Sequence, residues 1–413
     1  MKDYLDEASE DVSPRRAAAV GGLILLILVV ISIVRPSIRG SIELIVGIVL
    51  VVMLHELGHF VTAKRAGMKV TEFFLGFGPR IWSIKRGETE YGVKAIPAGG
   101  YNRIIGMSNL EDVDPADEAR TFRQAPFKDR IVVVLAGVTV NFVLALLLFF
   151  AVVVGHGLPY ATSTLNTISG KTPAASAGFE PGDRIVAIDG RRVSTWGQIT
   201  DAIEPNAGRV LTFTVVRHGQ PVTMTAKLTR NPRNNSIGFL GVSPDVGFKQ
   251  YSVPAAVPQS FVLTGSVIKQ EVGFFQHLFS PTGVKQYSKN FTSSSSSSGS
   301  STSSATQDAR PVSLIGIVDR GGALIGNDIW ALLALLALIN LVLAMFNVIP
   351  LLPFDGGHAA IAIYEAIASK VRGRRVQADF RKLIPASVVV LALLLTLGLS
   401  ATFLDIRHVI TGS

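Results

Sequence analysis

The hydrophobic residues of the chain gather into long runs that alternate with polar segments. A helix needs roughly 20 apolar residues to cross a hydrocarbon core about 30 Å thick. Five runs meet this need, the last with Pro385 at its start: residues 17–34, 42–63, 131–154, 329–350 and 384–404. The pattern predicts a polytopic α-helical membrane protein with about five transmembrane helices. Arg15 and Arg16 precede the first run and no small-residue cleavage site follows it, so we expect a retained anchor.

The polar segments between the runs predict β-structure in two places. Residues 80–85 and 90–96 alternate with period two around a turn at Arg86-Gly87, which predicts a β-hairpin. Residues 161–243 hold short apolar strands with turn signals, which predicts a compact β-rich domain. Residues 292–310 are mostly serine and predict a flexible linker. The expected organisation is therefore, by residue range, 1–40 (extra helix), 41–154 (first half of a membrane core), 161–243 (β-rich domain), 244–328 (segment with linker) and 329–413 (second half of the core).

Composition and charge support a membrane protein and give its orientation. The chain is 48% hydrophobic and 17% charged, with a mean hydropathy of +0.42 and a net charge of +9. Its basic residues concentrate after the second run and between the fourth and fifth. This is the positive-inside pattern, which places residues 67–128 and 355–383 in the cytoplasm and 155–328 outside. The charge therefore indicates topology rather than a nucleic-acid partner. Because the chain has no cysteine, a metal site would use nitrogen and oxygen ligands.

The second apolar run contains the sequence HELGH at residues 55–59. Histidines four residues apart lie on one helical face, so His55 and His59 can both reach one zinc ion, and Glu56 is the candidate general base. Ionisable groups at bilayer depth cost about 2.5–3.5 kcal/mol each on insertion scales and are rarely there without a role. The context therefore strengthens a motif that also occurs by chance.

A third protein ligand must come from elsewhere in the chain. Asp355 is the best candidate, because prolines end the fourth run before it and Gly356-Gly357 permits a sharp turn after it. With alternating spans, both histidines and Asp355 fall at similar depth near the cytoplasmic side. His358 remains an alternative ligand or a neighbour of the site.

Three other interpretations of these residues exist. A polar cluster lining a zinc- or proton-coupled transport path would predict further ionisable residues in the other runs, where almost none occur. An inactive scaffold would lack Glu56 or a ligand, and all four residues are present. The 161–243 region could also be a generic β-domain.

In the third run, Gly137 and Asn141 lie one turn apart. We expect close helix packing at Gly137 and leave open whether Asn141 hydrogen-bonds near the site.

These motifs together resemble the site-2 protease family of intramembrane zinc metalloproteases. HELGH is similar to the family's HExxH, residues 347–356 (NVIPLLPFDG) to its Asn-Pro-Asp-Gly motif, and Gly137 with Asn141 to its small-residue and Asn signature. Residues 77–79 and 96–101 resemble its cytoplasmic β-loop. Residues 173–190 resemble part of a permuted PDZ domain, as in the bacterial branch of the regulator of sigma-E protease type.

The resemblance implies fold, mechanism and partners. Zinc held by His55, His59 and Asp355 would activate water, Glu56 would accept its proton, and a peptide bond in the transmembrane helix of a single-pass protein would be hydrolysed. Substrates in the family are often anti-sigma factors in regulated intramembrane proteolysis. The implied substrate contacts are Asn347, Asn141, Gly99 and Gly100. The implied location is the inner or plasma membrane, with the PDZ domain extracytoplasmic and the active site near the cytoplasmic side of the lipid bilayer. The first run and the serine-rich linker depart from the family pattern.

Overall fold

The computed structural model describes residues 34–232, 234–278, 280–285, 317–318, 321–322, 325–326 and 328–411. The serine-rich segment and all but the last residue of the first predicted span lie outside the described residues. The chain divides into two compact units. One comprises Met1–Ala151 with Val257–Ser413 and is here called the membrane unit. The other is Val152–Ala256, here called the β-rich domain.

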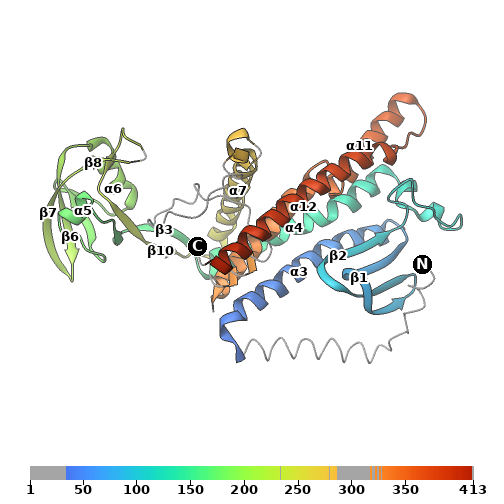
Figure 1. The fold of residues 1–413 in the computed structure, drawn as a ribbon, viewed down its shortest axis with the longest axis horizontal. Helices are drawn as coiled ribbons and strands as arrows, with labels where there is room; N and C mark the ends of the chain where they lie inside the picture. Colours follow the sequence, from blue (N-terminus) through green and yellow to red (C-terminus); the bar gives the residue numbers. More distant parts are fainter. Residues whose placement is uncertain are drawn as a thin grey trace. The chain divides into compact units, whose positions relative to one another are not determined.

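Four helices within the described residues are long and apolar enough to cross a membrane: α3 (Pro36–Arg65), α4 (Phe127–Gly155), α10 (Ile329–Val348) and α12 (Phe380–Thr411). They match the last four predicted spans. Figure 1 shows α3, α4 and α12 as long ribbons. The protein is therefore an α-helical membrane protein.

One face of α4 is buried and the other is exposed, as expected of a helix between protein and lipid. Its buried residues recur three or four positions apart: Val133, Val134, Gly137, Val138, Asn141, Ala145 and Phe149. Large apolar side chains are exposed on the opposite face, with Val132 at 56% and Leu147 at 57%. The polar residue Asn141 therefore points inward, and aliphatic residues point outward.

The predicted hairpin is present as β1 (Val70–Arg86) and β2 (Thr89–Ile104), which lie beside α3 in Figure 1. Both strands bend, so that residues 72–75 pair with 90–93 on one side and with 100–103 on the other. Gly76 and Gly78 have positive φ angles at the bend in β1, where an L side chain would be strained.

Ion pairs attach this hairpin to the rest of the membrane unit. Glu88, in the hairpin turn, accepts hydrogen bonds from Lys64 at the end of α3 and from Arg120 at 2.7 Å. Hydrogen bonds from Arg120 and then Lys64 lower the pKa of Glu88 to about 2. Arg120 ends the short helix η1 (Glu118–Arg120), which is followed by η2 (Phe122–Gln124). The turn is thus held at the end of the helix that carries HELGH.

Two further long helices lie within the described residues. In α7 (Val253–Leu278), Leu263 and Val267 pack against Ala145 of α4 and Ala337 of α10. The other helix, α11 (Asp355–Arg372), begins at the proposed third ligand.

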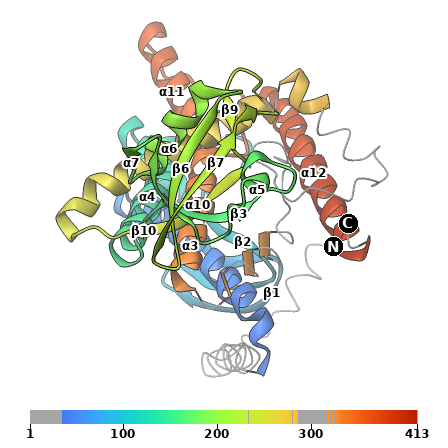
Figure 2. The same ribbon diagram turned by 90° about the vertical axis from the view of Figure 1, so that its left-hand side faces the viewer.

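The β-rich domain is built on a six-stranded sheet with strand order β10-β3-β4-β6-β7 and β5 paired to β4. Its elements are β3 (Leu158–Ile168), α5 (Pro173–Ser176), β4 (Arg184–Ile188), β5 (Arg191–Arg192), α6 (Trp196–Ile203), η3 (Glu204–Asn206), β6 (Val210–Arg217), β7 (Gln220–Lys227), β8 (Thr229–Arg230), β9 (Gly238–Phe239) and β10 (Val242–Lys249). Figure 2 shows α5 and α6 flanking β6 and β7.

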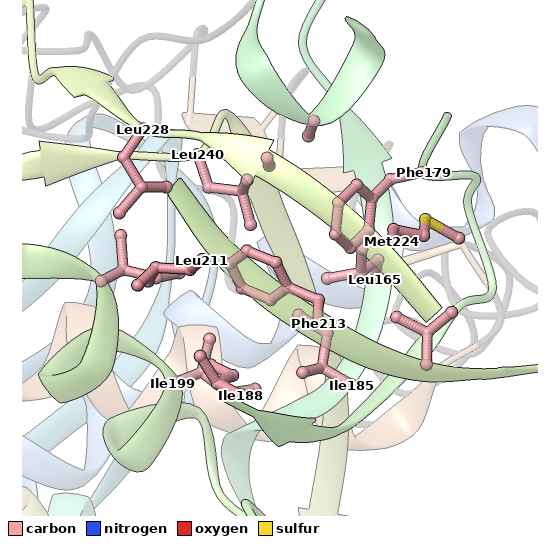
Figure 3. Close-up of a cluster of buried hydrophobic side chains, with 14 residues drawn as sticks. Leu165, Phe179, Ile185, Ile188, Ile199, Leu211, Phe213, Met224, Leu228 and Leu240 are labelled. Atoms are coloured by element: carbon pink, nitrogen blue, oxygen red, sulfur yellow. The ribbon is translucent and has the colours of Figure 1, made fainter. Parts of the chain in front are cut away.

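Apolar side chains from the sheet and α6 fill the centre of this domain (Figure 3). Phe213 and Ile185 are fully buried in the sheet, and Ile199 joins them from α6. The Phe179 and Phe213 rings meet edge to face with centroids 5.4 Å apart. Burial of this kind stabilises a domain in water by roughly 25 cal/mol per Å² of apolar surface.

Candidate metal centre

The two histidines of HELGH lie on the buried face of α3. Their Nε2 atoms are 3.3 Å apart, and both residues are less than 10% exposed. The carbonyl oxygen of Val133 on α4 lies 2.8 Å from His59 Nδ1. A proton on Nδ1 donates to this carbonyl, which orients the ring and leaves the Nε2 lone pair for a metal.

Asp355 reaches the same point from a distant part of the sequence. Its Oδ2 atom is 3.3 Å from His55 Nε2 and 3.2 Å from His59 Nε2. Gly356 and Gly357 are helical rather than part of a turn, and they allow α11 to start against the backbone of residues 348–352. A Cβ on Gly356 would lie 2.3 Å from the Val348 carbonyl oxygen. The glycines thus bring the start of α11 close to the end of α10.

His55 Nε2, His59 Nε2 and Asp355 Oδ2 form a nearly equilateral triangle with sides of 3.2–3.3 Å. Corners of a tetrahedron with metal–ligand bonds of about 2.0–2.1 Å lie about 3.3 Å apart, so the triangle has the size of one tetrahedral face. Two imidazole nitrogens and one carboxylate oxygen are also a donor set of catalytic zinc sites, with the fourth position left open. The residues therefore fit zinc, and they are the group of metal-binding side chains found in the described part of the chain.

Glu56 lies beside this triangle and beneath strand β2. A Cβ on Gly100 would lie 2.3 Å from Glu56 Cγ, so only glycine lets the strand approach this closely. The Asn102 side-chain amide also reaches the Glu56 backbone oxygen, at 3.5 Å. Gly99, the other predicted glycine, packs instead beside the ring of Phe77.

Gly137 on α4 contacts the metal-binding side chains themselves. A Cβ there would lie 2.2 Å from His59 Nε2 and 2.7 Å from His55 Cε1. We expected another helix to pack closely at this glycine. The groups that pack against it are the two imidazole rings of that helix.

The other predicted residues lie around this centre. Asn141 is fully buried one turn further along α4, and its backbone oxygen accepts a hydrogen bond from Asn340 on α10. Asn347 is half-buried in the last turn of α10. His358 is outside the metal-binding group, and its ring faces Phe380 at 6.4 Å between centroids. The roles predicted for Asn141, Asn347 and Gly99 remain predictions.

Sequence reasoning missed three residues that pair near this centre. Asn340 was one, and Arg130 and Glu365, which form a buried ion pair, were the others. Asn340 and Glu365 are polar or charged residues with apolar neighbours on their helices, a signal that could have been used, whereas Arg130 directly follows Lys128 and Asp129.

Comparison with known proteins identifies the family. The model of peptidase family M50 matches residues 43–395. The chain belongs to this family, the site-2 proteases. It is 33% identical over 394 residues to zinc metalloprotease Rip1 of Mycobacterium tuberculosis, covering 86% of this chain and 94% of that protein. It is 30% identical over 362 residues to metalloprotease MmpA of Caulobacter vibrioides, covering 80% of this chain and 88% of that protein.

Family membership agrees with the chemistry of the centre. The protein is a zinc metalloprotease of the membrane. A solved PDZ domain of an SdrC-like protein from Listeria monocytogenes is similar to part of this chain, with 19% identity and a TM-score of 0.18. The match covers 20% of this chain and 86% of the PDZ domain's chain.

Proposed function

We propose that this protein hydrolyses a peptide bond within the transmembrane helix of a single-pass membrane protein, as a step of regulated intramembrane proteolysis. Substrates of the anti-sigma-factor type are our first candidates. The observation that carries the proposal is the triangle of His55, His59 and Asp355, which has the size of a zinc site and has both histidines on a helix that suits a membrane.

The chain's residues would divide the work as follows. His55, His59 and Asp355 hold the zinc ion, which when bound acts as a Lewis acid and lowers the pKa of water. Val133 keeps the His59 ring oriented through its carbonyl oxygen. The Glu56 carboxylate accepts a proton from the attacking water and delivers it to the leaving amine. The buried surroundings of both histidines limit access of bulk water.

The substrate must present an unwound segment, because a helical peptide bond is shielded by its own turn. Residues 100–103 pair with β1 on one side and pass directly over Glu56. We propose that the substrate strand pairs with β2 here by β-augmentation, and that Gly99 and Gly100 contact its backbone. Asn347 and Asn141 are proposed to contact the substrate; Asn141 would need a local helix movement to become accessible, because it is fully buried here.

The β-rich domain is proposed to be a permuted PDZ domain that limits access by size or binds a newly made C-terminus. Its antiparallel sheet and the two helices α5 and α6 support this assignment. We place the domain outside the cell and the metal centre near the cytoplasmic face of the inner or plasma membrane, on the positions of the basic segments.

Cleavage of a tethered transmembrane reporter by the purified full-length protein in liposomes tests the proposal. Glu56→Gln removes the proton acceptor but no ligand, so we expect full zinc content and loss of cleavage by at least about 100-fold. Undiminished cleavage would rule out Glu56 as the base. Leu50→Ala, at a 58% exposed position on the same helix, is a control that should keep its activity.

Metal analysis of Asp355→Ala tests the ligand set separately. We expect zinc content to fall from one ion per protein toward zero at limiting zinc, since two histidines alone bind weakly. Full occupancy in this variant would point to another ligand, with His358→Ala as the next variant.

A further inference from the structure

The helix α4 provides none of the proposed metal ligands, yet it contacts every element that does. The contacts come from Arg130, Val133, Gly137 and Asn141. These positions are separated by three, four and four residues, so they form one stripe on the buried face of α4. The stripe extends over about 16 Å of helix.

The middle of the stripe holds the histidines. The Val133 carbonyl oxygen orients the His59 ring, and Gly137 leaves the space in which both imidazoles lie. The position of α3 relative to α4 therefore determines where both nitrogen ligands stand.

The ends of the stripe hold the two helices that flank Asp355. At one end, Asn340 Nδ2 of α10 donates to the Asn141 backbone oxygen at 2.7 Å, and both residues are fully buried. At the other end, Arg130 Nη1 donates to Glu365 Oε2 of α11 at 2.7 Å, with both side chains about 10% exposed. The second carboxylate oxygen of Glu365 accepts from the Ala378 amide. Asp355 lies between these two attachments, at the start of α11.

We propose that the stripe on α4 sets the distance between Asp355 and the two histidines, which makes Asn340, Arg130 and Glu365 positioning residues of the zinc site. The inference rests on the proposed ligand set. Its physical basis is that ligands from separate helices form a tetrahedral face only if the helices are held in register. Residues that orient metal ligands typically change metal affinity 10- to 100-fold when mutated.

Zinc affinity of the detergent-solubilised full-length protein, measured by competition with a fluorescent zinc chelator, tests the inference. Asn340→Leu has nearly the size of the native side chain but no donor. We expect a 10- to 100-fold weaker zinc affinity, a melting temperature of the zinc-free protein within a few degrees of wild type, and kcat restored at saturating zinc with KM unchanged. Asn340→Gln keeps an amide donor and should recover part of the affinity. Thr139→Val, on the exposed side of α4, is the matched control and should bind zinc as wild type does.

The ion pair provides an independent variant, should Asn340→Leu fail to fold. Replacing both partners at once, Arg130→Met with Glu365→Gln, removes the ion pair without leaving an unpaired buried charge and keeps an acceptor for the Ala378 amide. We again expect a 10- to 100-fold loss of zinc affinity. Wild-type affinity in both the Asn340→Leu and the paired variants would overturn the inference, as would an equal loss in Thr139→Val. Failure of the ligand set itself is recognised differently, by full zinc occupancy in Asp355→Ala.

Discussion

The membrane unit and the β-rich domain bury different kinds of group. The centre of the β-rich domain is apolar, with Phe213 and its neighbours packed away from water. The membrane unit buries His55, His59 and Asn141 and leaves aliphatic side chains such as Leu147 exposed. In water, removal of apolar surface stabilises a fold, whereas between lipid-facing helices it gives little, and packing and hydrogen bonds have to specify the contacts. A small substitution at a buried position should therefore weaken zinc binding in the membrane unit and lower the folding stability of the β-rich domain.

The substitution Gly137→Ala is expected to have the largest effect. The new Cβ would stand 2.2 Å from His59 Nε2, and something in the metal site must move. We expect zinc affinity and reporter cleavage both to fall by at least about 100-fold, measured by chelator competition and by the liposome assay. Gly398→Ala, in open space on α12, is the control. Normal zinc binding in Gly137→Ala would mean that α4 does not constrain the imidazoles.

The mutation Phe213→Ala tests the other unit. Loss of a fully buried aromatic ring should lower the free energy of unfolding of the β-rich domain by about 3–5 kcal/mol. Limited proteolysis of the full-length protein across a temperature range measures this, with Val210→Ala, 61% exposed on the same strand, as control. Because this core is separate from the metal centre, we expect unchanged zinc affinity. A coupled loss of zinc would contradict the independence of the two units.

The sequence predicted much of this arrangement because the signals are local. Apolar runs locate α3, α4, α10 and α12, and HELGH places its histidines by helical spacing alone. Asp355 could be added because the predicted topology puts it at the same depth as His59. The attachments to α4 could not be found this way: Asn340 and Asn141 are 199 residues apart, and Arg130 and Glu365 are 235 apart. Such pairs depend on helix packing, which no local pattern encodes.

The β-rich domain has an ion pair of its own, between Arg217 and Asp183, comparable with the Arg130–Glu365 pair of the membrane unit. Arg217 donates to both oxygens of the buried Asp183, at 2.7 and 2.8 Å. Burial alone would raise the pKa of Asp183, but the hydrogen bonds from Arg217, the hydrogen bond from the Glu180 amide and the nearby positive charge of Arg217 together outweigh it, and the pKa is lowered. This pair therefore stabilises the domain above the ordinary carboxyl pKa of about 4, and that stability is lost as pH falls toward the lower folded value.

The variant Arg217→Met should therefore destabilise the domain in a pH-dependent way. We expect a loss of about 2–3 kcal/mol at pH 7, because Asp183 is left buried without its charged partner. The difference from wild type should shrink as the pH falls below the ordinary carboxyl pKa of about 4, because protonation of Asp183 removes the advantage that the ion pair gives. Thermal unfolding at several pH values measures this, with the exposed Arg209→Met as control. A loss of stability that is the same at every pH would mean that Arg217 acts through packing alone.

The mildest effect is expected at Gly190, in the tight turn between β4 and β5. Asp189 and Gly190 have φ angles of 48° and 78°, a turn that suits Gly and Asn, and no atom lies within 4 Å of a Cβ built at Gly190. Gly190→Ala should cost about 1 kcal/mol through backbone strain alone, and Gly190→Asn less. Gly137 shows the reverse combination, ordinary helical backbone with no space for a methyl group. If Asn and Ala cost the same at Gly190, backbone conformation is not what selects glycine there, and the contrast between the two glycines fails.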